Sequence, residues 1–270
     1  MARPTIGYLT MLTGNVTTIA DPGSASGYPI TNIKDLKSYS LWKSSVLTSP
    51  IQIDVDNGGV AQNADYVALV NHNLFTLGAT LTVLADTFTP PTTVRLAAFT
   101  PGEDGVTLRT ITAPGALRYW RFTITDPSPP FAVAPYIGNL FCGMRTDLPE
   151  YMDPGFEPYF DDVEVEGVSS RKGHFLGAVT RGHAHDGVIA CGAAGAARAD
   201  YTGGLKAFID YANLRKPFVF VLDRDDTDFD DARYVRLRDD ARIERVSVGG
   251  SWARLAYRIP VTAAYMEPAP

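Results

Sequence analysis

Cysteine is scarce in this sequence, and so are the long apolar runs of membrane proteins. The 270 residues contain only Cys142 and Cys191, which excludes a disulfide scaffold and a cysteine-based zinc module and favours two unpaired core thiols over one bridge. The charge-free apolar stretch 131–144 is too short to span a bilayer and contains Pro135. The start of the chain lacks the apolar segment of a signal peptide. We therefore expect neither secretion nor membrane insertion.

Positive charge is also in short supply. The chain has 24 Lys and Arg against 30 Asp and Glu, a net charge of −6 and an isoelectric point of about 5.2. A general nucleic-acid binder needs a basic face to neutralise phosphates, so nucleic acid is not an expected partner. The Gly-x-Ser-x-Gly, Walker and His-Glu-x-x-His motifs are absent as well. We predict that the chain is not an enzyme and has no cofactor.

Two groups of residues resemble metal sites only in part. His183 and His185 would face the same way on a strand, but no third ligand is identifiable by spacing. Asp226, Asp228 and Asp230 have the alternate spacing of a calcium loop. That loop also needs a Gly at its sixth position and a Glu at its twelfth, and both are missing. A solvated turn is favoured, and no metal is expected.

What the sequence does contain is a pattern of short strands. Gly and Pro are frequent (24 and 19 residues), and they separate runs with the alternation of strands. In 119–125, Trp120, Phe122 and Ile124 share one face, and polar residues share the other. The remaining strands predicted in the first half are 51–55, 65–70 and 81–84. Several strands with turn signals between them predict a β-sandwich.

Charge density changes near residue 150. Residues 1–150 carry 20 charged side chains, and residues 151–270 carry 34. Pro149 and Pro154-Gly155 lie at this change and indicate a linker. We therefore predict two domains, 1–148 and 149–270. In the second, the periodicity predicts a helix over 204–214, and strands are predicted at 217–222 and 233–237. Gly249-Gly250 predicts a hairpin between 246–248 and 252–261.

The first-half segments, taken in order, resemble a discoidin-type, galactose-binding-like jelly roll. The resemblance covers most of residues 20–145 and rests on a series of motifs. These are Gly27-Tyr28-Pro29-Ile30-Thr31-Asn32-Ile33, Leu41-Trp42-Lys43-Ser44-Ser45, Ile51 to Val55, Asp65 to Leu74, Arg118 to Ile124 and Ile137 to Gly143. The stretch Ala68 to Leu74 is similar to modules in virion proteins of tailed phages.

The second half is similar in pattern to distal tail and minor tail proteins of long-tailed phages. The segments that resemble them are the 204–214 helix, 215–220, 234–237 and the closing strand 252–261. The resemblance implies a mainly β fold class, with an N-terminal jelly-roll β-sandwich and a C-terminal split-barrel-like β domain with one packed helix. It also implies that this second domain forms rings beneath a tail tube.

The expected function is therefore that of a structural protein of a phage tail tip or baseplate. Its partners would be the tail tube, the hub and tail-fibre or receptor-binding proteins, in a virion assembled from protein made in the host cytoplasm. A homo-oligomer is expected, with a hexamer favoured over a trimer. Paired charges can fix the register between subunits. The residues predicted for this interface are Arg236, Arg238, Arg242, Arg245, Arg254, Arg258, Asp226 and Asp228.

The alternative function is that of a carbohydrate-binding, lectin-like module used in attachment to a host surface. Jelly rolls of this type often present a pocket with aromatic and polar residues at the loop end. The candidate glycan-binding residues are Tyr28, Trp42, Asn71 and His72. A structural role competes with this hypothesis. In that role, Trp42 belongs to the core, and Asn71 and His72 hold a turn.

Overall fold

The structure is a computed structural model that describes residues 4–13, 18–37, 39–111, 115–148, 162–169, 175–184, 186–197, 204–221, 232–248 and 251–263. Contacts divide the chain into two compact units. The sandwich unit comprises Ala2–Leu148 and Pro217–Tyr234, and the second unit comprises Met1, Pro149–Lys216 and Val235–Pro270. The segment Pro217–Tyr234 thus returns to the sandwich unit, although the charge density along the sequence assigns it to the second domain.

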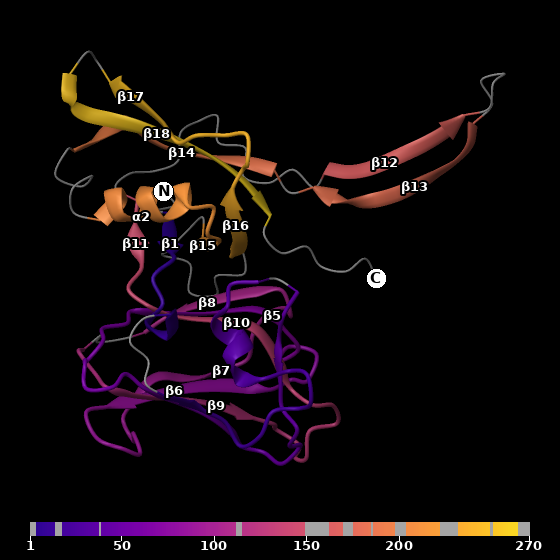
Figure 1. The fold of residues 1–270 in the computed structure, drawn as a ribbon, viewed down its shortest axis with the longest axis vertical. Coiled ribbons are helices and arrows are strands. Elements are labelled where there is room, and N and C mark those ends of the chain that lie inside the picture. The colour runs from indigo at the N-terminus through magenta and orange to yellow at the C-terminus, as the bar shows by residue number, and fades with distance from the viewer. Residues whose placement is uncertain are drawn as a thin grey trace. The chain divides into compact units, whose positions relative to one another are not determined.

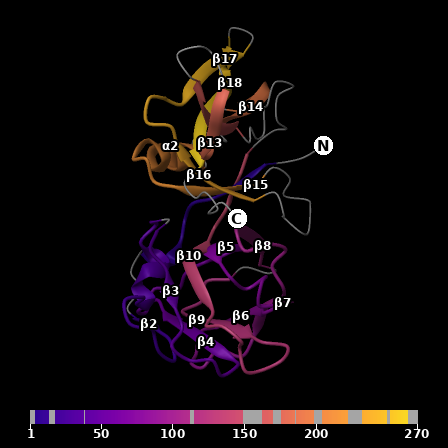
Figure 2. The same ribbon diagram turned by 90° about the vertical axis from the view of Figure 1, so that its right-hand side faces the viewer.

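Two antiparallel sheets form the body of the sandwich unit, and Figure 1 and Figure 2 show them as two layers. One sheet has the order β3 (Trp42–Lys43), β10 (Tyr136–Gly143), β5 (Tyr66–His72) and β8 (Val106–Thr110). The other has the order β2 (Thr18–Ala20), β4 (Ile51–Asp56), β9 (Tyr119–Thr125), β6 (Thr80–Asp86) and β7 (Val94–Phe99). The 3-10 turn η1 (Met11–Thr13) precedes β2, and the 3-10 turn η2 (Ile30–Lys34) lies between β2 and β3.

Alternation along the strands creates the core between these sheets. In β4, Ile51, Ile53 and Val55 are buried while the residues between them are half-buried. β9 follows the same pattern, as its sequence predicts, with Trp120, Phe122 and Ile124 inside. Fully burying an aliphatic or aromatic side chain of this size stabilises a fold by roughly 1.5–3 kcal/mol. The core cluster of buried side chains therefore holds the two sheets face to face.

A smaller group of strands completes the sandwich unit. β1 (Thr5–Gly7) pairs antiparallel with β11 (Thr146–Asp147) on one side and with β15 (Phe218–Val221) on the other. All four residues of β15 are buried, in agreement with the strand predicted over 217–222. Tyr234 also belongs to this unit, and its ring contacts Phe141 of β10 edge-on, with the ring centroids 5.8 Å apart.

The second unit is also built mainly of strands. β18 (Ser251–Ala263) pairs with β14 (Asp186–Ala197), with β16 (Arg233–Leu237) and with β17 (Glu244–Val248). The β17–β18 pairing confirms the hairpin predicted around Gly249-Gly250, whose two residues lie outside the described ones. The predicted helix is present as α2 (Lys206–Asn213), with Phe208, Ile209 and Ala212 on its buried face. Thr202, whose side chain could cap that helix, lies outside the described residues.

β12 (Asp162–Ser169) and β13 (Phe175–Ala184) form a separate two-stranded antiparallel sheet, visible as a ribbon in Figure 1. Among the described strands, each pairs only with the other. The sequence did not lead us to predict this ribbon. The mainly β fold class is confirmed, with a jelly-roll β-sandwich and a C-terminal β unit that contains a helix.

Candidate functional site

One end of the sandwich gathers four of its loops. Antiparallel pairing places the start of β4 beside the end of β9, and the end of β5 beside the starts of β8 and β10. The loops that enter or leave the strands at these points are 44–50, 73–79, 100–105 and 126–135. We call this the loop end. It lies at the opposite end of the strands from Gly143, after which the chain leaves the sandwich.

Asn73 connects two of these loops. Its Nδ2 donates to the carbonyl oxygen of Ala134 at 3.1 Å, and its Oδ1 accepts from the backbone N–H of Tyr136 at 2.8 Å. A third loop joins through Phe131, whose backbone N–H donates to the carbonyl of Leu47 at 2.9 Å. Buried polar groups that are satisfied in this way hold loops in one arrangement.

Asp104 fixes the fourth loop. Its Oδ1 accepts from the backbone N–H groups of Phe75 and Thr76 at 2.9 and 3.1 Å, and its Oδ2 accepts from the Thr76 hydroxyl. The loop 73–79 is therefore tied to 100–105 without any contribution from the Phe75 side chain. That side chain is half exposed.

Large apolar side chains are exposed on or beside three of these loops. The exposed fraction of the residue is between 42% and 56% in Tyr28, Leu47, Phe75 and Val133. Tyr28 precedes β3, and its carbonyl oxygen accepts from the backbone N–H of Lys43. Single exposed apolar side chains are common on protein surfaces, but several at one end of a fold are candidates for contact with a ligand. Sequence reasoning missed Phe75 and Leu47, since nothing in a single sequence separates an exposed loop phenylalanine from a buried one.

Trp42, one of the four predicted glycan-binding residues, lies inside the sandwich. Its side chain is fully buried in the core cluster, and its indole Nε1 donates to Asp21 Oδ2 at 2.7 Å. A buried indole N–H needs such a partner, and the carboxylate supplies it. Trp42 therefore offers no face to a ligand at the surface, which corrects the position expected for it in a glycan site.

His72 is also fully buried. Its Nδ1 accepts the backbone N–H of Leu74 at 3.2 Å, so the side chain holds a turn. Burial lowers the pKa of His72 to about 4, although the Asp104 carboxylate acts in the opposite direction. The histidine is thus neutral at pH 7 and does not reach the surface, so the structural role that competed with glycan binding describes it correctly.

The other two candidates are nearer the surface. Asn71 is half-buried and has a φ of 54°, the left-handed conformation that asparagine tolerates better than most residues. Tyr28 is the only one of the four whose ring is substantially exposed. The structure therefore does not bring the four predicted side chains together at one exposed surface.

The arginines predicted for a subunit interface fall into three groups. Arg236 pairs with Asp239 and Arg238 with Asp240, at 2.6 and 3.1 Å, so these charges are matched within one turn of the same chain. Arg242 is exposed and lines a pocket in the second unit. The side chains of Arg245, Arg254 and Arg258, and the whole of Asp226 and Asp228, lie outside the described residues.

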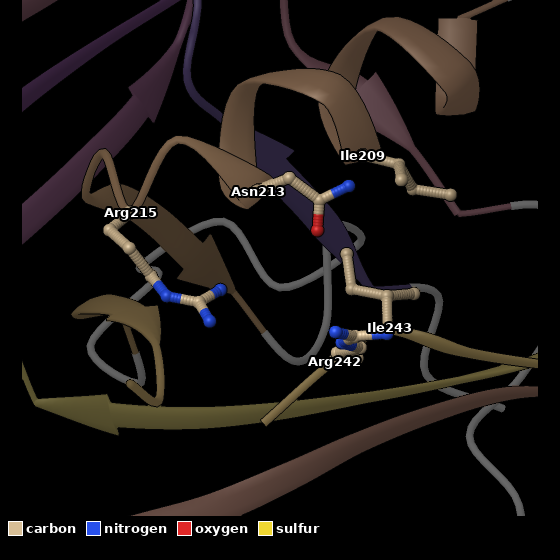
Figure 3. A pocket seen from close by; sticks show the side chains of 5 residues that line it. All are labelled: Ile209, Asn213, Arg215, Arg242 and Ile243. Carbon is tan, nitrogen blue, oxygen red and sulfur yellow. The ribbon is translucent and has the colours of Figure 1, made fainter. Parts of the chain in front are cut away.

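That pocket has a volume of about 400 Å³ and is lined by Ile209, Asn213, Arg215, Arg242 and Ile243 (Figure 3). The first two side chains come from α2, Arg215 follows the helix, and the last two precede β17.

Among the described residues, no three His, Cys, Asp or Glu side chains are grouped as ligands for a metal ion. In the same part of the chain, no helix is long and apolar enough to cross a membrane.

The thiol of Cys142 is free and buried in the core cluster. Burial raises its pKa well above the usual value, and the neighbouring Asp65 carboxylate adds to this effect. A protonated, inaccessible thiol is a poor nucleophile. Cys142 is therefore a core residue. The side chain of Cys191 lies outside the described residues.

Comparison with known proteins gives structural similarities only. The sequence matches no family model and no curated protein. Among solved structures, one similar to this chain is chitosan-binding module 1 of a chitosanase/glucanase from Paenibacillus sp. IK-5, with 20% identity and a TM-score of 0.41 over 50% of this chain and 98% of that one. The module CpGH89CBM32-4 produced by Clostridium perfringens has 18% identity and a TM-score of 0.39 over 50% and 99%.

A third similar structure is the CBM32 of AlyQ, solved in complex with 4,5-unsaturated mannuronic acid. It has 16% identity and a TM-score of 0.38, over 47% of this chain and 94% of that one. The sheets and the core of the structure itself define the class as a mainly β protein with a jelly-roll sandwich.

Proposed function

We propose that this chain is a non-enzymatic binding protein whose sandwich unit binds carbohydrate at the loop end. The observation that carries the proposal is the exposure of two aromatic side chains, Phe75 and Tyr28, on backbone that hydrogen bonds hold in place. Aromatic rings provide rigid apolar area at a small cost in conformational entropy, and the apolar faces of sugar rings pack on such area.

The surroundings of these rings suit a polar ligand. Ser45 and Thr48 are exposed on the loop 44–50, and their hydroxyl groups can donate and accept hydrogen bonds. Because Asp104 and Asn73 already fix the loops, little backbone has to be ordered when a ligand binds. Trp42 and His72 contribute indirectly, since they support β3 and the turn after β5 from inside.

A glycan array probed with the full chain tests this proposal. We expect binding to at least one glycan, and we expect Phe75→Ala or Tyr28→Ala to weaken it by about tenfold through the loss of ring contact. The matched control is Phe88→Ala, because Phe88 is equally exposed but lies in the loop between β6 and β7, at the other end of the sandwich. A folded chain that binds no glycan, or a Phe88 variant that loses as much affinity, would contradict the proposal.

A second candidate function is the structural one implied by the resemblance to tail-tip proteins. The β12–β13 ribbon favours it, because each of these strands pairs only with the other in the described part of the chain. An isolated two-stranded ribbon is marginally stable in water, and contact with another copy of the chain would stabilise it. A homo-oligomer, with a hexamer preferred to a trimer, would meet this requirement.

Native mass spectrometry of the full chain distinguishes these states. The structural function predicts a hexamer, or else a trimer, and replacement of 162–184 by a short Gly-Ser linker should convert it to monomers. A monomeric full chain at micromolar concentration excludes the ring. The structural function also predicts a position at the tail tip, beside the tube, hub and receptor-binding proteins. Gold labelling of this protein in assembled virions tests that position.

A further inference from the structure

The pocket of the second unit is lined by both cationic and apolar side chains. Arg215 reaches it from the segment after α2, Arg242 and Ile243 from the neighbouring residues before β17, and Ile209 from α2 (Figure 3). The Asn213 amide points into the same space from α2 (Figure 3). At about 400 Å³ the pocket falls within the size range of small-molecule sites.

Arg215 is held in a single position. It follows α2 with a φ of 59°, and its backbone N–H donates to the carbonyl of Ala212 at 2.8 Å. Its Nη2 donates to the carbonyl oxygens of Asp239 and Ala241, at 3.1 and 3.0 Å. These bonds tie the end of the helix to the segment that carries Arg242. They use one nitrogen of the guanidinium, and a guanidinium has three.

Two acidic side chains that the structure describes near the pocket, Asp239 and Asp240, are already engaged. Asp239 accepts two hydrogen bonds from Arg236, at 2.6 and 3.2 Å, and this arginine holds the pKa of Asp239 below its usual value. Asp240 is paired with Arg238 in the same way. Arg242 has no ion pair with any residue that the structure describes. The described lining of the pocket therefore carries positive charge, from Arg215 and Arg242, in a protein whose net charge is negative.

We propose that this pocket binds a carboxylate group carried on a short aliphatic stem. Arg242 can present two parallel N–H donors to the two oxygens of a carboxylate, and the Nη1 of Arg215 with the Asn213 amide can donate to the remaining lone pairs. Ile209 and Ile243 would then contact the stem. The apolar walls favour such a ligand over inorganic phosphate, which is polar on every side. This site does not depend on the glycan-binding proposal.

Isovalerate is the direct probe, titrated into the full chain by calorimetry and by NMR of the arginine Nε–H and Asn213 amide signals. We expect isovalerate to bind and to shift these signals. Isovaleramide should bind at least about tenfold more weakly because it lacks the negative charge, and phosphate should do so because it has no stem for the apolar walls. An acetylated dipeptide that ends in valine, with a free or an amidated C-terminus, distinguishes a peptide end from a free acid as the source of the carboxylate.

Arg242→Gln is the informative variant, because Arg242 is exposed and its loss should not affect folding. We expect it to weaken isovalerate binding about tenfold or more. Arg238→Gln removes the same charge from the same turn but does not line the pocket, and it should keep the affinity within about twofold. Equal binding of the amide, tighter binding of phosphate, failure of isovalerate to bind, or an unchanged Arg242→Gln would each overturn the proposal.

Discussion

Buried polar side chains are the residues whose roles in the sandwich unit are hardest to assign from sequence. Trp42 illustrates the difficulty, because a tryptophan near a loop fits a core residue but also a ligand-stacking ring. Its partner Asp21 lies 21 residues earlier in the chain, and only the folded structure brings the two together. His72 poses the same difficulty, since its Nδ1 accepts a local N–H that no sequence pattern specifies.

The buried His72 should make stability depend on pH. Its folded-state pKa of about 4 lies below the ordinary value of 6.5, so the unfolded chain binds more protons between these values. The stability that His72 contributes is therefore present above pH 6.5 and is lost as the pH falls toward 4. The loss should amount to about 3 kcal/mol, measured as the free energy of unfolding in urea.

His72→Asn isolates this effect, because asparagine keeps an acceptor near the position of Nδ1 but does not titrate. The variant should be less stable at pH 7, since it has lost ring contacts. Its stability should fall less steeply than that of the wild type between pH 6.5 and pH 4. Lowered aspartate pKa values, such as that of Asp56, act mainly below this window. Parallel pH profiles for the two proteins would show that His72 titrates normally.

At the scale of elements, strand alternation was the most informative sequence signal. β9 begins and ends where its pattern predicts, because Trp120, Phe122 and Ile124 face a single core. Periodicity likewise located α2, since its apolar face is continuous. The β12–β13 ribbon was not predicted. A strand with no face buried in a shared core does not need alternating apolar and polar residues. Pairing between distant residues also produces no pattern in the local sequence.

Gly143, at the end of β10, is required by a close crossing of the backbone. A Cβ at this position would lie 2.2 Å from the carbonyl oxygen of Leu9, whose neighbouring segment is fixed because the same oxygen accepts from the Tyr66 hydroxyl. Gly143→Ala should therefore lower the free energy of unfolding by about 2 kcal/mol, since backbone atoms have to shift. Urea denaturation followed by circular dichroism measures the change.

The control for this variant is Gly115→Ala. A Cβ at Gly115 would have its nearest neighbour, Leu117 Cγ, at 3.9 Å, which is an ordinary contact. We expect its stability to stay within about 0.5 kcal/mol of the wild type. If the two variants were equally stable, the crossing of residues 9 and 10 over β10 would not be as close as the structure has it.

For the whole molecule, the main surprise is the return of the chain to the sandwich unit. The strand pattern over 217–222 predicts β15 correctly, but its partner β1 lies more than two hundred residues earlier. Charge density gives no sign of this pairing, because an apolar strand such as β15 carries no charge that would assign it to either domain. A division of the chain after residue 148 would therefore leave β1 without one of its two neighbours.

A fragment that ends at residue 148 should accordingly be less stable than the sandwich unit in the full chain. It loses the β1–β15 pairing and the contact of Tyr234 with Phe141, together with the burial of Phe220. We expect a loss of roughly 3–5 kcal/mol in the free energy of unfolding. Fluorescence of Trp42 and Trp120, both buried in the sandwich, reports this unfolding when Trp252 is replaced by Phe in the full chain.

Adding 217–234 to the fragment through a flexible Gly-Ser linker should recover most of the stability, because that segment supplies both missing partners. An exposed edge strand also promotes association, so the shorter fragment should aggregate more readily at the same concentration. Equal unfolding midpoints for the two fragments would mean that β15 and Tyr234 add nothing to the sandwich. Residues 1–148 would then form a complete domain, as the change in charge density predicts.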